Sequence, residues 1–158
     1  MSTTSTTASE TTGAQYATFY LDGLYFGIEV LKVQEVIRHQ VMTPVPLAPD
    51  TVRGLINLRG QIVTALDLRA RLGLTPRAAD TLPMNVVVRT ADGAISLLVD
   101  EIDDVVEVSP EQFEPAPETV RMKVGGLVTG VYKLAARLLL ILDVERAVET
   151  DGRSGEAA

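Results

Sequence analysis

The stretch MNVVVRTADGAISLLVD, residues 84–100, carries the strongest structural signal in this chain, because two apolar runs flank an Asp-Gly pair. A tight type I′ turn needs positive φ at both central residues, so the stretch predicts a β-hairpin that turns at Asp92-Gly93. Strand pairing about this turn sets Val88 opposite Leu97 and leaves apolar side chains on both faces. A half-exposed sheet would alternate apolar and polar residues, so this hairpin is expected to be covered from two sides.

Two more hairpins and a short helix are predicted in the first half of the chain. Asp22-Gly23 joins the apolar runs QYATFYL and LYFGIE, and Leu58-Arg59-Gly60 joins RGLIN to QIVTALD. Gly60 is the expected left-handed residue of the latter turn. Asp67 then stands where an N-cap is needed for the short helix LRARL, which Gly73 would end.

The same order of elements returns in the second half. From Met84 onward a hairpin is followed by a third strand, DVVEV, then by the strands GLVTGV and RLLLILD, and finally by a short helix capped by Asp143. Gly23 and Gly93 are separated by nearly the same interval as Asp67 and Asp143. Similar offsets at both ends of the pattern indicate an internal repeat.

The repeat predicts an all-β fold with two similar parts, at about residues 15–75 and 82–149. Five strands in each part suit a small closed barrel, because closure removes exposed sheet edges. Each part alone would be a marginal domain, so the two are expected to pack as one unit. The doubly apolar hairpin at 84–99 is the candidate for the layer that they share.

Composition argues against several classes of function. A net charge of -7 over 158 residues disfavours binding to nucleic acid or anionic lipid, because phosphate contacts need clustered Lys and Arg. The chain has no cysteine, and its longest purely apolar run, 138–142, is too short to span a bilayer. We expect a cytoplasmic protein without direct membrane insertion. Residues 1–14 and 150–158 are small and polar, and are predicted to be disordered, flexible tails.

Few residues suggest catalysis. His39 is the only histidine, lacks partners at metal-ligand spacing and is interpreted as a solvated loop residue. An acidic group follows the apolar run ISLLV and has some similarity to the phosphate-accepting aspartates of receiver domains, but those domains need long helices between parallel strands. We interpret the group as a solvated turn, with phosphate acceptance at Asp100 or Asp104 as a minor alternative; its members are Asp100, Glu101, Asp103, Asp104 and Glu107. No enzyme activity, metal or cofactor is predicted.

Apolar and basic positions near turns favour protein binding instead. Arg59 lies at a predicted hairpin tip, where it is either an ordinary solubilising residue or a fork for a partner's carboxylate. The segment EVLKVQEVIR holds more valines than one face of a short strand can bury. Most of its apolar residues are expected in the core, but one or two are expected at the surface, where they would mark a binding site: Val30, Val33, Val36 and Ile37.

Several motifs, in order, resemble the CheW family of bacterial chemotaxis coupling proteins. The first half contains GIEVLKVQEVIR, TPVPLAPDTVRGLINLRGQIV and ALDLRARLGL, and the second half contains SLLVDEIDDVVEV, EQFEPAP and GVYKLAARLLLILDVERAV. The resemblance covers about residues 15–149. It implies two intertwined five-stranded barrels similar to SH3 domains, with short helices and without enzymatic activity. Thr64 departs from the family pattern, in which proline is common at this place.

The resemblance also implies partners and contact residues. It implies an adaptor that bridges the cytoplasmic tips of transmembrane chemoreceptors to the regulatory domain of the histidine kinase CheA, and that joins other scaffolds in receptor arrays. Arg59 and Gly60 match the family's characteristic turn, whose arginine supports receptor and kinase control. Val33 and Glu35 match positions of partner contact, and Val30, with Val33, matches the apolar patch that meets the kinase. A non-flagellar pathway, such as surface motility or gene expression, remains an alternative setting.

Overall fold

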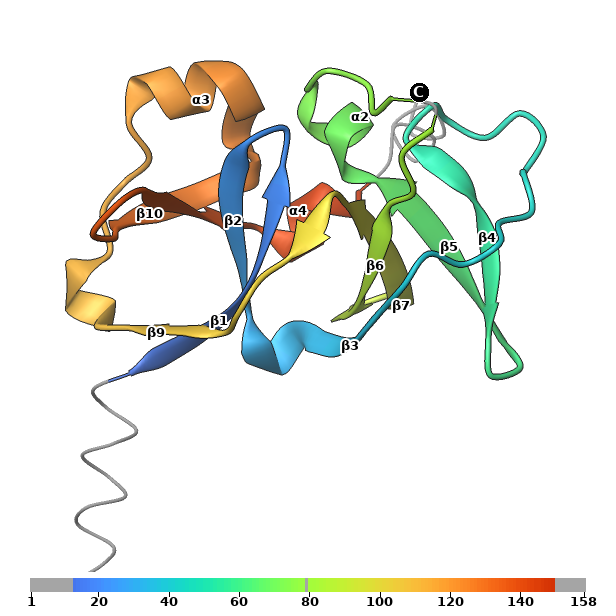
Figure 1. Ribbon diagram of the computed structural model, residues 1–158, viewed down its shortest axis with the longest axis horizontal. Coiled ribbons are helices and arrows are strands. Elements are labelled where there is room, and N and C mark those ends of the chain that lie inside the picture. The colour runs from blue at the N-terminus through green and yellow to red at the C-terminus, as the bar shows by residue number, and fades with distance from the viewer. Residues whose placement is uncertain (1–12, 79, 150–158) are drawn as a thin grey trace, which may run out of the picture.

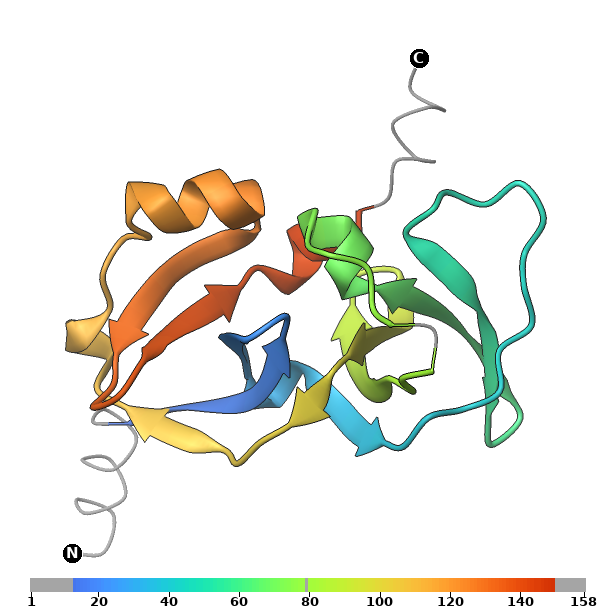
Figure 2. The same ribbon diagram turned by 45° about the horizontal axis from the view of Figure 1, so that its top comes forward.

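The computed structural model describes residues 13–78 and 80–149. The predicted tails therefore lie outside the described residues, apart from Gly13 and Ala14. Two β-sheets lie beside each other; α2 (Leu68–Leu72) and α3 (Glu118–Val124) lie at the top of the view in Figure 1, and α4 (Val144–Ala147) lies between the sheets (Figures 1 and 2).

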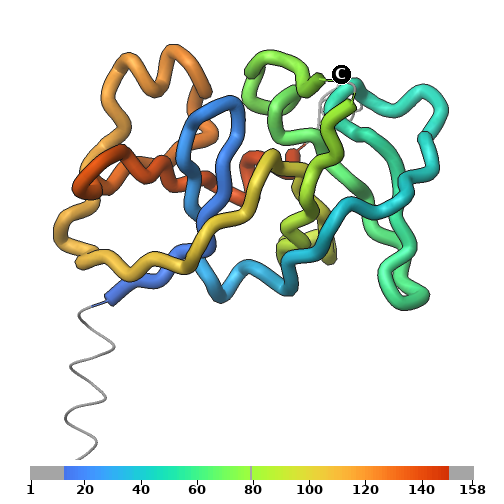
Figure 3. The backbone as a smooth tube through the Cα atoms, viewed as in Figure 1, coloured from blue at the N-terminus to red at the C-terminus, as the bar shows by residue number. Residues whose placement is uncertain are grey.

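Each sheet combines strands from both halves of the chain. Sheet A has the order β10-β11-β2-β1-β8, and β9 also pairs with β1; its strands are β1 (Ala14–Leu21), β2 (Leu24–Glu29), β8 (Glu101–Ile102), β9 (Val106–Val108), β10 (Val128–Lys133) and β11 (Leu138–Leu142). Sheet B has the order β3-β6-β7-β5-β4; its strands are β3 (Val33–Ile37), β4 (Val52–Leu58), β5 (Gln61–Asp67), β6 (Met84–Thr90) and β7 (Gly93–Val99). The two halves have thus exchanged hairpins, as the tube in Figure 3 shows where the blue β1–β2 hairpin lies near the red C-terminal strands. The predicted all-β, intertwined fold is confirmed, but among the described residues neither sheet forms the closed barrel that was expected, because β10 does not pair with β8 and β3 does not pair with β4.

The predicted helix caps are present. Asp67 accepts a hydrogen bond of 3.0 Å from the Arg69 amide at the start of α2 (Leu68–Leu72), and Gly73 ends that helix with a φ of 73°. Asp143 accepts one of 3.2 Å from the Arg146 amide at the start of α4 (Val144–Ala147). A further helix, α3 (Glu118–Val124), was not predicted. Within the described ranges, three short 3-10 turns complete the elements: η1 (Val30–Lys32), η2 (Pro110–Gln112) and η3 (Gly125–Leu127).

The turn of the β6–β7 hairpin differs from the predicted one. Thr90 pairs with Gly93, so Ala91 and Asp92 form the turn and Val88 lies opposite Ile95 rather than opposite the predicted Leu97. The Thr90 hydroxyl explains the shift, because it accepts a hydrogen bond from the Asp92 amide (3.1 Å) and donates one to the Gly93 carbonyl (2.7 Å). A shift of two residues keeps every side chain on its predicted face, since side chains alternate with a period of two.

The β6–β7 hairpin is covered on both faces, as predicted. Val86 and Val88 face a large apolar core that also contains Phe19 and Phe26 from sheet A. Val87, on the opposite face, lies in a smaller core made by sheet B; its buried members are Ile56, Leu58, Val63, Ala65, Val87 and Leu98. The β6–β7 hairpin therefore separates the smaller core, formed within sheet B, from the large core that joins the two sheets.

Sheet A has six strands rather than the predicted five. The expected strand DVVEV is reduced to β9, and the additional short strand β8 precedes it. Residues 103–105 separate β8 from β9 and face only two residues of β1, so the ladder is interrupted by a bulge. Side chains hold the interruption in place: the Tyr25 hydroxyl donates to Asp103 (3.0 Å), and the Thr18 hydroxyl donates to the Asp104 carbonyl.

The loop between β3 and β4 contains a strained turn at its tip. The Ala48 amide donates to the Val45 carbonyl (3.3 Å), with Pro46 and Leu47 between them. Leu47 has a φ of 65°, and its side chain is fully exposed. This third position of a type II turn favours glycine or asparagine, because a side chain at positive φ is strained.

We predict that Leu47→Gly raises the free energy of unfolding by about 0.5–1 kcal/mol, because relief of the positive φ outweighs the added chain entropy of glycine. Urea denaturation followed by circular dichroism measures the change. Leu82→Gly is the matched control, since Leu82 is also exposed but does not have a positive φ. Equal destabilisation of both variants would contradict the prediction.

Candidate functional site

Two of the predicted site residues, Arg59 and Glu35, contact each other although they lie on different strands. Arg59 and Gly60 form the β4–β5 turn with φ values of 53° and 87°, so the predicted left-handed turn is present. The Arg59 guanidinium donates a hydrogen bond to the Glu35 carboxylate of β3 and forms an ion pair with it. This hydrogen bond from Arg59 holds the pKa of the Glu35 carboxyl below its ordinary value.

The Arg59–Glu35 pair lies at the surface. The Arg59 side chain is 69% exposed, whereas that of Glu35 is 18% exposed. Glu35 therefore orients an arginine that is otherwise accessible, at the end of a hairpin that projects from sheet B (Figure 1). A guanidinium held in this way suits recognition of a carboxylate, because the fork does not have to be ordered on binding.

The apolar candidates Val30 and Val33 lie in η1 and β3, close to Glu35 in sequence. Arg89 of β6 donates to the carbonyls of Leu31 (3.2 Å) and Val33 (3.1 Å), which fixes η1 against sheet B. Val33 is partly buried against the large core, and Val30 is also partly buried. The most exposed apolar side chain of the segment is Leu31, at 88%, which was not among the predicted residues. The most exposed residue is thus Leu31 rather than the predicted Val30, because the 3-10 turn η1 interrupts the expected strand and changes which side chains face the solvent.

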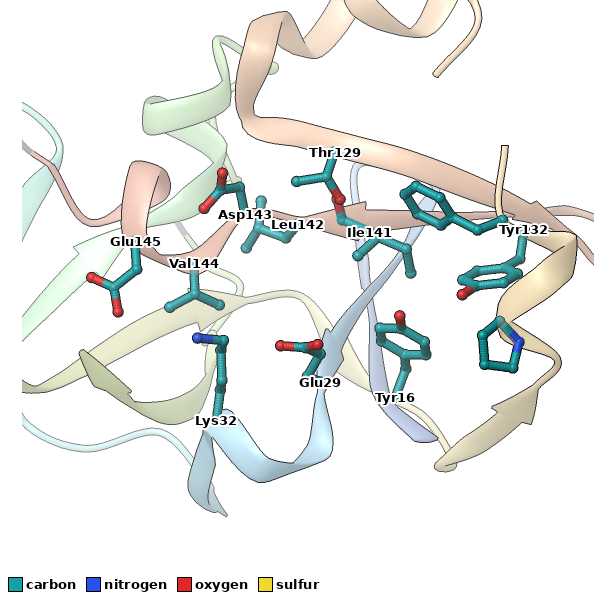
Figure 4. A pocket seen from close by; sticks show the side chains of 12 residues that line it. Tyr16, Glu29, Lys32, Thr129, Tyr132, Ile141, Leu142, Asp143, Val144 and Glu145 are labelled. Carbon is teal, nitrogen blue, oxygen red and sulfur yellow. The ribbon is translucent and has the colours of Figure 1, made fainter. Parts of the chain in front are cut away.

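A pocket of about 400 Å³ opens where η1 approaches α4 (Figure 4). Its wall on one side is made by the side chains of Tyr16 and Tyr132, and its other side carries Glu29 and Lys32. No sequence motif indicated this pocket, because it is built from segments far apart in the chain: β1, β2, η1, η2, β10, β11 and α4.

The predicted solvated acidic turn is wrong for Asp100. Its carboxylate accepts hydrogen bonds from Arg69 (2.6 and 3.0 Å), Arg77 (2.9 Å) and the Asp22 amide (2.8 Å), and its side chain is only 17% exposed. Burial raises the pKa of Asp100, but the hydrogen bonds from Arg69, the Asp22 amide and Arg77 outweigh burial, so the pKa lies below its ordinary value. Asp100 therefore ties the β1–β2 turn of sheet A to the α2 region beside sheet B.

The other candidates for chemistry are also explained by structure. His39 is partly buried rather than solvated, and its Nδ1 is enclosed without a hydrogen-bond partner among the described residues. Asp67 caps α2 and forms an ion pair with Arg53. Within residues 13–78 and 80–149, no group of three or more His, Cys, Asp or Glu side chains is arranged to hold a metal ion. In the same ranges, none of the helices is long and apolar enough to cross a bilayer.

Comparison with known proteins identifies the family. The model of the CheW-like domain matches residues 15–151. The chain belongs to the CheW family. It is 31% identical over 151 residues to the chemotaxis protein CheW of Klebsiella aerogenes, covering 96% of this chain and 91% of that one, and 30% identical over 145 residues to CheW of Bacillus subtilis, covering 92% and 93%.

A solved CheW structure has the same fold. The scaffolding protein TtCheW from Thermoanaerobacter tengcongensis superposes with a TM-score of 0.79 at 26% sequence identity, covering 88% of this chain and 94% of that one. The resemblance to the CheW family inferred from the motifs is therefore confirmed, and the SH3-like character of the fold agrees with it.

We predict that Asp100→Asn lowers the free energy of unfolding at pH 7 by about 1–3 kcal/mol, because two guanidinium groups lose their charged acceptor. The folded-state pKa of Asp100 lies below its unfolded value, so its contribution is present above about pH 4 and is lost as pH falls through the folded pKa. Urea denaturation at pH 7 and at pH 3 measures the free energy of unfolding of wild type and variant. The difference between the two proteins should be smaller at pH 3 than at pH 7.

Asp104→Asn is the matched control for this measurement, because Asp104 is an exposed member of the same acidic group. It should change stability little at either pH. If Asp100→Asn lowers the free energy of unfolding by the same amount at pH 7 and at pH 3, the charge of Asp100 is not the source of its contribution.

Proposed function

We propose that this CheW-family protein is a non-catalytic adaptor that couples transmembrane chemoreceptors to the histidine kinase CheA in cytoplasmic chemosensory arrays. The observation that carries the proposal is the convergence of Arg59 and Glu35, which come from different strands, on one exposed surface. The names of the relatives support it, since they are chemotaxis proteins and the solved structure is of a scaffolding protein.

The mechanism relies on rigid presentation of surfaces. The shared core fixes sheet A against sheet B, so the positions of η1, β3 and the β4–β5 turn are set by packing. In our proposal the Val30–Val33 side meets the regulatory domain of the kinase, and a groove between the two barrels accepts the receptor helix hairpin. Another array scaffold can occupy a remaining face. Receptor state would then reach the kinase as a change in docking free energy of about 1–3 kcal/mol.

We predict that Arg59→Glu leaves the protein folded but prevents receptors from controlling the kinase, because the exposed cation is replaced by an anion beside Glu35. The assay is ATP consumption by reconstituted receptor fragments and kinase, with and without this protein, and circular dichroism checks the fold. The double variant Glu35→Arg/Arg59→Glu restores opposite charges within the pair.

The outcomes separate partner contact from internal pairing. If Arg59 meets a partner, the double variant stays inactive although its ion pair is restored. Full coupling by the single variant would overturn the role of Arg59. Full coupling by the double variant alone would reduce that role to holding the hairpin in place.

We predict that Val33→Asp lowers the free energy of unfolding by about 1–3 kcal/mol, because Val33 packs against the large core and an aspartate there loses solvation. Val36→Asp is the matched control, since Val36 on the same strand is 39% exposed and should tolerate the change within about 0.5 kcal/mol. Chemical denaturation measures both. Equal losses in the free energy of unfolding for Val33→Asp and Val36→Asp would contradict the prediction that burial of Val33 makes it the more sensitive position.

Two alternatives would use the same chain differently. A coupling protein of a non-flagellar pathway would present the same surfaces to other receptors, and reconstitution with each candidate kinase of the host distinguishes the pathways. A phosphate-accepting regulator using Asp100 or Asp104 would need a free carboxylate. Both Asp100 oxygens already accept hydrogen bonds, whereas Asp104 is exposed. Incubation with a labelled phosphoryl donor tests it, because an adaptor stays unlabelled.

A further inference from the structure

The pocket between η1 and α4, here called the junction pocket, has two chemically different ends (Figure 4). Tyr16, Phe113 and Tyr132 form an aromatic wall at one end. The Tyr16 and Tyr132 rings lie 5.6 Å apart and those of Phe113 and Tyr132 lie 5.4 Å apart, between ring centroids. Phe113 is 41% exposed, whereas Tyr16 and Tyr132 are buried, so Phe113 supplies most of the apolar surface that the wall offers to a ligand.

The other end of the junction pocket is acidic. Glu29, Asp143 and Glu145 line it together with a single cation, Lys32. Among the described residues, none of these carboxylates forms an ion pair within 4 Å. Asp143 caps α4, and Glu145 accepts a long hydrogen bond (3.5 Å) from the Ala91 amide, whereas Glu29 is exposed and makes no capping bond to η1.

Glu29 is the carboxylate of the acidic end that lies next to Tyr16 of the aromatic wall (Figure 4). Burial raises the pKa of the Tyr16 hydroxyl, the hydrogen bond with Tyr132 raises it further, and the negative charge of Glu29 adds to the rise. Tyr16 and Glu29 are also register partners across β1 and β2, so the acidic end and the aromatic wall are close enough to act on one ligand. A carboxylate next to an aromatic surface favours a cation with an apolar stem, because the stem packs on the rings while the charge meets the carboxylate.

We propose that the junction pocket binds a segment of a partner protein that carries an arginine or lysine next to an apolar side chain, with Glu29 as the residue that selects the basic group. Three carboxylates against one ammonium repel an acidic segment, and the net charge of -7 disfavours nucleic acid and anionic lipid. The proposal goes beyond the adaptor role, since it assigns a chemistry to a surface that contains neither Arg59 nor Glu35.

The test uses the full ¹⁵N-labelled chain and two blocked tripeptides, Leu-Arg-Leu and Leu-citrulline-Leu, titrated to millimolar concentrations by NMR. Citrulline keeps the shape of arginine without its charge. We expect saturable shifts at the amides of the junction pocket, with the arginine peptide bound about fivefold more tightly. Higher salt should reduce that ratio, because the carboxylate is exposed.

Variants separate the two ends of the pocket. Glu29→Lys should abolish the preference for arginine, whereas Glu101→Lys, the same charge change at an exposed residue outside the pocket, should retain it. Phe113→Ala should weaken both peptides by a similar factor. Equal binding of the two peptides by wild type, shifts confined to other surfaces, absence of saturable shifts, or an unchanged preference in Glu29→Lys would each overturn the proposal. The peptides contain no receptor or kinase, so these results are independent of the coupling assay.

Discussion

The structure depends on one apolar core that neither half of the chain could build alone. Phe19 and Phe26 of the first hairpin pack in the same core as Val86 and Val88 of the third. Burial of such side chains contributes on the order of 1.5–3 kcal/mol each, so this shared interior outweighs any single polar contact between the sheets. The geometry of the proposed binding surfaces depends on this core, because η1 and β3 follow directly from β2, which is anchored in it.

Polar groups add direction to this non-directional packing. Asp100 receives two guanidinium groups from the α2 region and an amide from the β1–β2 turn, so it specifies how the first hairpin lies against sheet B. Arg89 does the same for η1 through two carbonyl groups. Such bonds contribute modestly to stability but are sensitive to angle, and they define one arrangement among several that an apolar core alone would accept.

The features that could be predicted from sequence are those set by neighbouring residues. Asp22-Gly23 and Gly60 predict tight turns, and Asp67 predicts the start of a helix, because turn formation and helix capping depend on residues only a few positions apart. The faces of the β6–β7 strands were also predictable, although the Thr90 hydroxyl moved the turn. The helix α3 was missed because it has only seven residues and is flanked by prolines and glycines.

What sequence could not provide is contact between distant segments. The pairing of Arg59 with Glu35 joins two segments of the first half that β6 and β7 separate in sheet B. The burial of Asp100 between two arginines and the junction pocket arise from how segments of different halves meet. Each of these residues looks like an ordinary surface charge in its local context. The family resemblance named Arg59 and Glu35 as candidates, but only the fold shows that they touch.

The hairpin exchange has a consequence for synthesis on the ribosome. Sheet B can assemble once β7 has left the exit tunnel, but sheet A has to wait for β10 and β11, which come near the end of the chain. During that interval the first hairpin, synthesised earliest, exposes aromatic side chains whose remaining neighbours do not yet exist. Nascent chains of this protein are therefore candidates for protection by chaperones until translation is nearly complete.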